Sequence, residues 1–310
     1  MLFDLHCDTL FELDKNGNNL DCSNLAVSLS AMEKFNRFIR CFAIFTPDEL
    51  KGTDAQNHFN RLYTLFKKQH QLFKDRITHI IDLKTLQNAC VGAVLTVENG
   101  SVLAGELSEI KRLANLGVKM ITLTWNGENE LGFGQLENRG LKPFGKQCVA
   151  VMEQNGIIVD VSHLSDRGFE DVCSISKKPF VASHSNARRV CGHKRNLADE
   201  QILEIISRGG IIGLNFYRAF LNERPALADK FDLLRHAEHI LELGGENALC
   251  IGTDFDGADV LPPFQNDTGL LSLGSFFCEN GFPSETVNNI LFKNAYHFFE
   301  TYLKEEEVQK

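Results

Sequence analysis

The chain contains 310 residues, of which 43% are hydrophobic and 24% are charged. This is ordinary globular composition, and a chain of this length can bury a substantial core. Lys and Arg number 32 against 41 Asp and Glu, which gives a formal net charge of −9. Because no basic stretch is available to neutralise phosphates, this acidic surplus argues against nucleic acid as a partner. The length predicts one domain over residues 1–310.

The nine cysteines are scattered along the chain and form no CxxC pair. Several lie in apolar runs, as Cys41 does in RCFAIF, so we expect most of them to be reduced core thiols. The first residues, MLFDLH, contain neither the basic region nor the cleavage site of a secretory signal. No apolar stretch reaches the length of a bilayer span. We therefore expect a cytoplasmic protein without a membrane partner.

Eight short apolar runs alternate with helical segments along the chain. The runs cover residues 1–8, 38–45, 91–98, 118–125, 156–163, 178–185, 210–217 and 248–257. Most are nearly continuous in Val, Ile, Leu and small residues, which is typical of parallel strands covered on both faces. This alternation predicts an α/β fold of the (β/α)8 TIM-type barrel class. A doubly wound open sheet is the alternative, but no Gly-rich nucleotide-binding loop follows the first run.

Amphipathic stretches separate the apolar runs and predict the helices. They include residues 55–74, 105–115 and 229–243. On the third stretch, five apolar residues share one helical face. They are Phe231, Leu234, Ala237, Ile240 and Leu241. Four histidines on the predicted helices are expected to be surface or packing residues, namely His58, His70, His236 and His239.

Six residues of metal-ligand type stand at the ends of five predicted strands. In a (β/α)8 barrel, residues at the C-terminal strand ends face the active site. The first strand ends in DLHCD, where His6 and Asp8 point the same way and Cys7 points to the opposite face. The other four are Glu98 in VENG, His163 in VDVSH, His184 in VASHS and Asp254 in IGTDF.

Three imidazoles and three carboxylates on one rim favour Zn²⁺ or a similar divalent ion. One catalytic zinc keeps an open position and needs fewer ligands, so the set suits two metals bridged by one carboxylate. Each residue alone has a structural explanation: Glu98 could cap a helix, and Asp254 could form an Asx-turn. The joint pattern over five strands is what predicts a metal site. Asp160, out of phase with His163, and Asp256, expected in a turn, are left outside the set.

At these residues the sequence resembles the renal (membrane) dipeptidase family of the metal-dependent amidohydrolase superfamily. The motifs DLHCDT, VENG, VDVSH, SHSNARRVCGHKRNL, GLNFY and IGTDFDG occur in the family's order. The block from His184 to Leu197 is the most specific of them. The resemblance implies a (β/α)8 barrel, two zinc ions, hydrolysis of dipeptides and a homodimer. Because the chain ends in LKEEEVQK rather than a lipid-anchor signal, the likeness is to the soluble, bacterial branch.

The resemblance also implies a role for each ligand-type residue. His6 and Asp8 would bind one zinc ion, Glu98 would bridge both ions, and His163 and His184 would bind the second ion. A hydroxide held between the two ions would then attack the peptide carbonyl, since bound metal lowers the pKa of water from about 16 to about 7.

Three further residues match family positions in the substrate pocket. Asp254 matches the catalytic aspartate beside the first zinc, which would accept the hydroxide proton and pass it to the leaving amine. Arg195 in KRNL matches the arginine that receives the C-terminal carboxylate of the dipeptide. Tyr217 in NFY matches a pocket tyrosine.

One position departs from the family. Its best-known members have a histidine after the fourth strand, in a TLTH context, that contacts the substrate carbonyl. Here the segment reads ITLTWNGENELGFG, with Trp125 in that place. An indole N–H donates one hydrogen bond but carries no charge. Either Trp125 donates that bond, or Asn126 or Asn129 replaces it, or Trp125 shapes an apolar pocket.

We therefore expect a binuclear zinc dipeptidase acting on L-Xaa-Xaa substrates, with a D-residue at the C-terminal position left open. The alternative, suggested by Trp125, is a related amidohydrolase that cuts another amide, a lactam or an N-acyl amino acid. A third reading is a barrel that binds small molecules or partners without catalysis. Its signature would be the loss of a ligand, and all six ligand-type residues are present.

Overall fold

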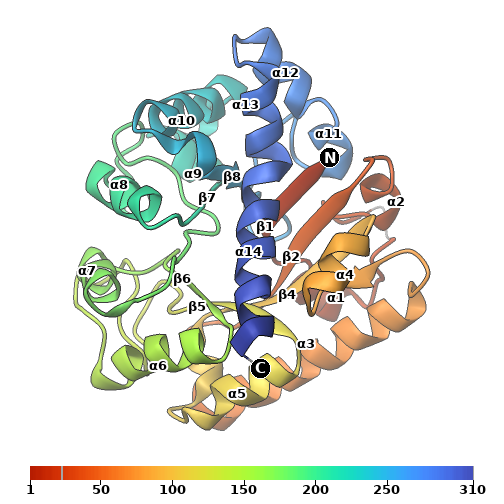
Figure 1. Ribbon diagram of the computed structural model, residues 1–310. Coiled ribbons are helices and arrows are strands. Elements are labelled where there is room, and N and C mark those ends of the chain that lie inside the picture. Colours follow the sequence, from red (N-terminus) through yellow and green to blue (C-terminus); the bar gives the residue numbers. More distant parts are fainter. Residues whose placement is uncertain (22–23, 310) are drawn as a thin grey trace.

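The computed structural model describes residues 1–21 and 24–309, in which a parallel sheet is surrounded by helices (Figure 1). The strands are β1 (Leu2–Cys7), β2 (Phe38–Phe45), β3 (Thr78–His79), β4 (Val91–Glu98), β5 (Val118–Thr122), β6 (Ile158–Asp160), β7 (Ile212–Leu214) and β8 (Leu249–Ile251). The helices are α1 (Thr9–Asn16), α2 (Leu29–Met32), α3 (Gly52–Leu72), α4 (Leu83–Asn88), α5 (Ser108–Asn115), α6 (Pro143–Gln154), α7 (Asp166–Ile175), α8 (Asp199–Ser207), α9 (Arg218–Leu221), α10 (Lys230–Glu242), α11 (Asp267–Leu270), α12 (Leu273–Glu279), α13 (Ser284–Asn288) and α14 (Asn294–Gln309).

The sheet closes into a ring. Its strands follow the order β6-β5-β4-β2-β1-β8-β7, and all the pairs are parallel. Parallel bridges from Asp160 to Val181 and from Ala182 to Ile212 connect β6 to β7 through the segment Val181–Ala182. The predicted (β/α)8 TIM-type barrel is thereby confirmed. Strand β3, which the sequence analysis did not predict, pairs only with the beginning of β4.

The predicted strand at 178–185 is wrong as a continuous strand, because within it only Val181 and Ala182 form bridges, the first to β6 and the second to β7. Beyond them, side chains take the backbone donors that a regular ladder would use. The N–H of Ser183 donates to Asp160 Oδ1 at 2.9 Å, and that of His184 donates to Ser162 Oγ at 3.1 Å. These side-chain acceptors satisfy the backbone but end the strand early.

Strand β1 changes phase just before its polar end. Asp4 pairs with Arg40 and Cys7 pairs with Phe42, so β1 has one residue more than β2 between these two pairs. Such a bulge shifts the side-chain alternation by one residue. As a result Cys7 lies in the core between sheet and helices, as predicted, and His6 faces the barrel axis.

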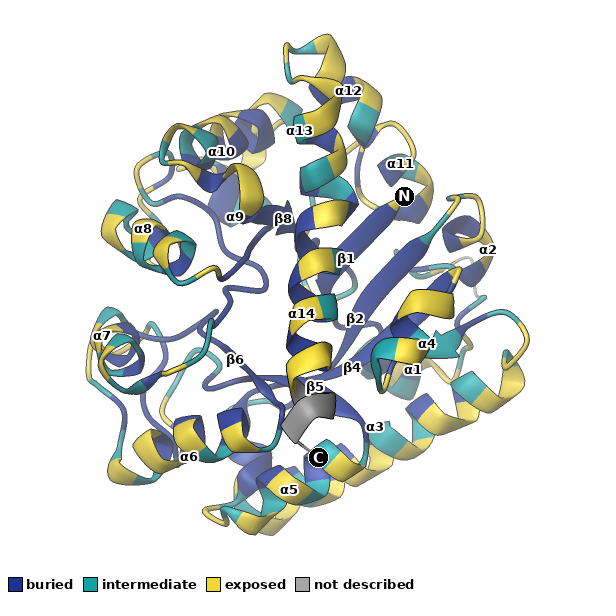
Figure 2. Ribbon diagram, in the orientation of Figure 1, coloured by how far each residue is buried: buried dark blue, intermediate teal, exposed yellow. Residues whose placement is uncertain are grey.

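Helix α14 crosses the end of the barrel at which the strands begin (Figure 1). The ring of Phe299 lies 5.0 Å from that of Phe3, and Tyr302 Oη donates to the carbonyl of Ile157, the residue before β6. Figure 2 shows the strands buried and the exposed residues on the outer faces of the helices. Because α14 closes one end, the cavity lies at the other, where the strands end.

The predicted helices at 55–74, 105–115 and 229–243 correspond to α3, α5 and α10. On α10 the predicted inner residues Leu234, Ala237 and Ile240 are buried, whereas Phe231 is 43% exposed. Phe231 lies in the first turn, at the edge of the core, and packs edge to face on Phe276. His236 is fully buried as a packing residue, with its ring nitrogens bonded to backbone groups.

The described cysteines are all free thiols, and five of the eight are buried. The ninth, Cys22, lies outside the described residues. Within residues 1–21 and 24–309, no helix is both long enough and apolar enough to span a membrane.

A buried ion network links β1, β2 and α11. Arg40 is fully buried, and its guanidinium donates to Asp4 at 2.8 Å and pairs with Asp267 at 2.7 Å. Burial by itself lowers the pKa of Arg40, but the two carboxylates raise it well above its ordinary value. The pairing therefore keeps Arg40 charged and leaves neither carboxylate without a cation.

Replacing Arg40 with methionine is expected to lower the free energy of unfolding by about 3–5 kcal/mol, because it leaves two buried carboxylates uncompensated. Denaturant titration measures this loss. The matched control is Arg61→Met, which removes an exposed pair with Asp14 and is expected to cost about 1 kcal/mol or less. Equal losses in the two variants would contradict the structural importance of the buried network.

Candidate metal centre

Six side chains of metal-ligand type come together at the open rim of the barrel. They come from the ends of β1, β4, β6 and β8 and from the segment after Val181–Ala182. The six are His6, Asp8, Glu98, His163, His184 and Asp254. All are buried, with at most 9% of any of them exposed. The structure thus brings together every ligand-type residue that the sequence predicted.

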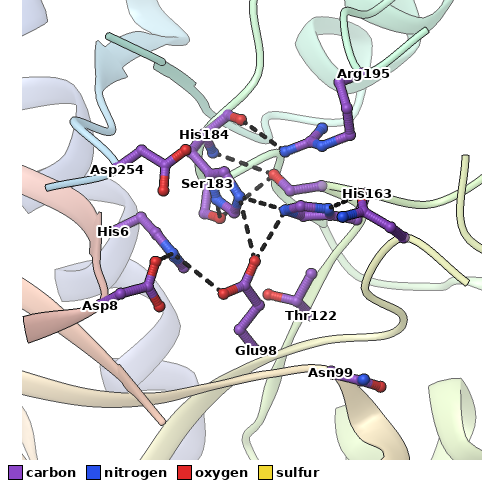
Figure 3. Close-up of polar contacts among 12 residues, drawn as sticks. His6, Asp8, Glu98, Asn99, Thr122, His163, Ser183, His184, Arg195 and Asp254 are labelled. Carbon is purple, nitrogen blue, oxygen red and sulfur yellow. Dashed lines mark hydrogen bonds and ion pairs between the residues drawn. The ribbon is translucent and has the colours of Figure 1, made fainter. Parts of the chain in front are cut away.

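Glu98 lies between His6 on one side and His163 on the other, as Figure 3 shows. Its Oε2 is 3.5 Å from His6 Nε2, while its Oε1 is 2.9 Å from His163 Nε2 and 3.6 Å from His184 Nε2. Asp8 Oδ2 lies 3.4 Å from the same nitrogen of His6. The two oxygens of Glu98 therefore face two different sets of ligands, which is the arrangement a bridging carboxylate needs.

The donor atoms fit a divalent metal. Two groups of ligand atoms each lie within 4.8 Å of one another: His6, Glu98 and His184, and His6, Asp8 and Asp254. Among the described residues, His6 Nε2 and Asp8 Oδ1 are buried without a hydrogen-bond partner. Buried polar atoms are costly when they are unpaired, and imidazole and carboxylate together suit zinc. The unpaired atoms and the donor set therefore both indicate a metal.

Burial disfavours the ionised forms of Glu98 and Asp254. Burial, followed by the neighbouring Asp8 carboxylate, raises the pKa of Glu98 to about 8. Burial also raises the pKa of Asp254, although His6 and the hydrogen bond from Asn215 partly oppose this increase. A bound cation would replace the proton on such groups.

The three imidazoles differ in the direction in which their pKa is shifted. Burial lowers the pKa of His6, but Glu98 and Asp8 raise it well above its ordinary value. Burial lowers the pKa of His163 and of His184 well below the ordinary value, and nearby positive groups add to this shift. These two rings are therefore neutral, so each has a nitrogen lone pair available for a metal.

The ring nitrogens that face away from Glu98 have partners. His163 Nδ1 lies 3.0 Å from Asn126 Oδ1. His184 Nδ1 lies 2.7 Å from Ser183 Oγ, which in turn donates to Asp160 Oδ2 at 2.6 Å. Such partners fix the orientation of a ligating imidazole.

Two buried aspartates that the sequence analysis did not use hold the strand ends. Asp4 Oδ1 accepts the N–H of Thr253 at 2.8 Å and that of His6 at 3.4 Å. Asp160 accepts both the N–H and the hydroxyl of Ser183. Asp4 stands two positions before His6, and Asp160 stands two positions before Ser162. This D-x-polar spacing is the sequence signal that could have indicated their role.

The structure also tests whether Glu98 caps a helix and whether Asp254 forms an Asx-turn. Asn99, and not Glu98, caps the following helical turn by accepting the N–H of Ser101 at 3.1 Å. The Asp254 carboxylate accepts a hydrogen bond from Asn215 Nδ2 at 3.0 Å rather than closing a turn. Both acidic side chains thus remain directed to the rim.

Left-handed backbone conformations gather at the rim. Four of the five non-glycine residues with positive φ in the described chain are Asn99 (79°), His163 (68°), Asp254 (62°) and Asp256 (64°). Each such residue costs about 1–3 kcal/mol, and such residues concentrate at functional sites. Asp256 accepts a hydrogen bond from Thr9 Oγ1 at 2.7 Å and is a turn residue, as expected.

A cavity of about 390 Å³ opens above the six side chains. It is lined by Asp8, Phe11, Glu12, Lys15, Phe45, Glu98, Trp125, Asn126, Gln135, His163, His193, Arg195, Tyr217, Phe220, Asp254, Asp256, Gly257 and Ala258. All three predicted substrate-binding residues, Arg195, Trp125 and Tyr217, are among them. A volume of this size suits a small ligand.

Arg195 forms one wall of the cavity and is only 4% exposed. Its Nη1 donates to Ser185 Oγ at 3.3 Å. Its Nη2 donates to the carbonyl of His184 at 3.2 Å (Figure 3). Its Nε is buried without a partner among the described residues. Burial lowers the pKa of Arg195 to about 10, so the group stays charged at neutral pH.

An aromatic wall stands on the other side of the cavity, formed by Phe11, Phe45 and Trp125. The ring of Phe45 lies 5.1 Å from that of Phe11 and 4.9 Å from that of Trp125, both edge to face. Phe45 ends β2 and Trp125 follows β5, whereas Arg195 follows the segment Val181–Ala182. In the ring of strands, β2 lies opposite that segment. Arg195 and Phe45 therefore line the cavity from opposite strands of the barrel, and Trp125 packs beside Phe45.

The structure reduces the three alternatives for the position of Trp125. Asn129 Nδ2 donates to Asn99 Oδ1 and to the carbonyl of Leu123, each at 2.8 Å. Because its Oδ1 also accepts two backbone N–H groups, Asn129 is occupied by its own loop. Trp125 belongs to the aromatic wall, whereas Asn126 lines the cavity and its Oδ1 contacts His163 Nδ1.

The chain is similar to known dipeptidases in sequence and structure. The model of the membrane dipeptidase family, peptidase family M19, matches residues 1–309. A Schizosaccharomyces pombe protein described as an uncharacterised dipeptidase is 32% identical over 180 residues, which is 55% of this chain and 42% of that protein. A Klebsiella pneumoniae protein from the pqqA 5′ region is 27% identical over 67% of this chain and 81% of its own length. The aligned part thus covers less than half of the yeast relative.

Solved structures of metallopeptidases are also similar to this chain. A crystal structure of a family M19 metallopeptidase, dipeptidase AC, superposes with a TM-score of 0.90 at 25% identity and covers 98% of both chains. A metallopeptidase of Rhodobacter sphaeroides, with a phosphinate mimic of the dipeptide L-Ala-D-Ala, gives 0.89 at 24% identity, again over 98% of both chains. With the family model matching nearly every residue, the chain belongs to the membrane dipeptidase family, peptidase family M19.

Proposed function

We propose that the protein is a dipeptidase that uses two zinc ions bridged by Glu98. The observation that carries this proposal is that one cavity is lined both by buried Arg195 and by four of the six buried ligand-type side chains, namely Asp8, Glu98, His163 and Asp254. The six ligand-type residues would hold the metals, and Arg195 would bind the C-terminal end of the substrate. Membership of the family supports the same activity.

The ligand distances support a division of the site into two positions. His6 and Asp8 would hold one ion, because His6 Nε2 faces Glu98 Oε2 and Asp8 Oδ2 lies beside the same nitrogen. His163 and His184 would hold the other, because both face its Oε1. Bound zinc would supply a Lewis acid and would lower the pKa of water to about 7.

Asp254 would transfer protons, and Arg195 and Tyr217 would orient the substrate. Asp254 has a raised pKa and lies on the cavity, so it would accept a proton from the attacking water and deliver it to the leaving amine. Arg195 would bind the C-terminal carboxylate through its planar donors, and Tyr217 would line the pocket beside it. The aromatic wall would then receive the side chain on the other side of the cut bond.

A substrate panel tests this function. With zinc, the protein is expected to cleave L-Xaa-L-Xaa or L-Xaa-D-Xaa dipeptides and to fail on the same dipeptides with an amidated C-terminus. Arg195→Met is expected to raise KM for the free dipeptide by about tenfold or more, because a buried charged hydrogen bond is lost. Equal KM values for the variant and the native protein would exclude the carboxylate role.

The same panel addresses the alternative, a related amidohydrolase acting on another amide, a lactam or an N-acyl amino acid. The apolar wall around Trp125 favours it, since an acyl chain or a fused ring could pack there as well as a side chain. Faster cleavage of N-acyl amino acids than of any dipeptide would establish this alternative. Binding of the panel without any cleavage would favour a non-catalytic barrel.

The homodimer implied by the resemblance is part of the proposal, and light scattering measures it. A cytoplasmic location is also proposed, supported by the free state of all eight described cysteines.

A further inference from the structure

We propose that Asn126 is a positioning residue that fixes the imidazole of His163 for metal binding, and that Gln135 sets the direction of the Asn126 amide. The inference rests on the metal site proposed above. It assigns a task to two residues of the loop after β5 that the ligand set does not include.

The first step concerns the ring of His163. Its Nε2 lies 2.9 Å from Glu98 Oε1 and 2.9 Å from His184 Nε2, so this nitrogen faces the other ligands. A metal needs the lone pair of that nitrogen, which places the hydrogen of the neutral ring on Nδ1. Nδ1 therefore needs an acceptor, and Asn126 Oδ1 lies 3.0 Å from it.

The second step concerns the direction of the amide. An asparagine side chain can turn over and present its NH₂ group instead of its oxygen. Gln135 Nε2 donates to the same Asn126 Oδ1 at 3.2 Å. Asn126 Oδ1 thus accepts from both His163 Nδ1 and Gln135 Nε2. If the amide turned over, both hydrogen bonds would be lost, and the NH₂ group of Asn126 would face these two donors instead. Gln135 thus keeps the oxygen of Asn126 on His163.

The third step concerns the loop that carries both residues. The N–H of Gly134 donates to the carbonyl of Gly127 at 2.8 Å, and that of Leu136 donates to the carbonyl of Asn126 at 3.1 Å. A side chain at Gly134 would have its Cβ 2.0 Å from the carbonyl oxygen of Trp125, so only glycine permits this close return. Gly134 also bridges to Leu164, the residue after His163. The loop is therefore connected to the ligand by its backbone as well as by its side chains.

His163 differs in this respect from His184. The Nδ1 of His184 contacts Ser183 and, through it, Asp160 inside the barrel. The Nδ1 of His163 relies on a loop at the cavity mouth. The geometry thus makes one of the two proposed metal positions depend on the loop.

Zinc affinity, measured by competition with a chromophoric chelator, tests the proposal without an activity assay. Asn126→Leu removes the acceptor and is expected to weaken the binding of one of the two zinc ions by about 10- to 100-fold. Gln135→Glu replaces the donor with an acceptor, which favours the turned-over amide and is expected to weaken the same ion. Asn126→Asp keeps an oxygen toward both donors and is expected to retain both ions, although it adds the same charge as Gln135→Glu.

The control is Asn138→Leu, the same change on an exposed residue of the same loop, whose amide oxygen accepts the N–H of Arg167. It is expected to leave zinc affinity unchanged. Native-like affinity in both Asn126→Leu and Gln135→Glu would overturn the proposal. So would equal losses in Gln135→Glu and Asn126→Asp, since that would indicate an effect of charge. If Asn126→Leu does not fold, the comparison of the other two variants decides. Failure of the native protein to bind zinc would instead overturn the proposed function.

Discussion

Replacing Asp254 with asparagine is expected to lower kcat for dipeptide hydrolysis by about 10²- to 10⁴-fold, the range over which general acid–base groups act. An amide of the same shape cannot carry a proton between the attacking water and the leaving amine. The fold should tolerate the change, because asparagine accepts the positive φ of 62° at this position. Its amide oxygen can still accept the hydrogen bond from Asn215.

The measurement is kcat with zinc content determined on the same sample. We expect the variant to keep its zinc, since five other ligand-type side chains remain. A parallel loss of zinc and of activity would identify Asp254 as a necessary ligand and would refute its separate role in proton transfer.

Removing the metal with a chelator is expected to abolish dipeptide hydrolysis, and added zinc is expected to restore it with two ions per chain. Without metal, the site is left with unpaired buried atoms such as His6 Nε2 and Asp8 Oδ1. Because burial raises the pKa of Glu98 to about 8, zinc must displace a proton at neutral pH. Reconstitution should therefore become weaker as the pH falls below about 8.

Glu98→Gln sharpens this experiment. The variant keeps the shape of the bridging side chain but not its charge, and it is expected to bind fewer than two zinc ions and to remain inactive after zinc is added. Glu285→Gln, the same change on the exposed face of α13, serves as the control and should behave as the native protein. Full activity in the metal-free protein would reject the zinc mechanism.

Much of the fold was predictable because it depends on local patterns. Continuous apolar runs and amphipathic stretches indicated seven of the eight barrel strands and the main helices. The segment 178–185 was predicted too long, because its backbone donors are taken by Asp160 and Ser162, side chains from a neighbouring strand. Strand β3 was missed because it has only two residues.

The ligand-type residues were also predictable, since a barrel brings all strand ends to one rim. Cys7 was correctly excluded by alternation, although the inward position of His6 depends on a bulge in β1 that no pattern showed. That strand end is held by Asp4 through Thr253, 249 residues away along the chain. No reading of a single strand could have found such a partner.

The sequence by itself determined which residues have metal-ligand chemistry and at which end of the barrel they gather, because strand order and alternation are properties of short segments. Only the tertiary structure decided how these residues face one another. It placed Glu98 between His6 on one side and His163 and His184 on the other. It also lined one cavity with Arg195 and Trp125, and it directed Asn126 rather than Asn129 to His163. Those arrangements depend on contacts between distant segments, and distances across a closed barrel are not encoded in any one of its strands.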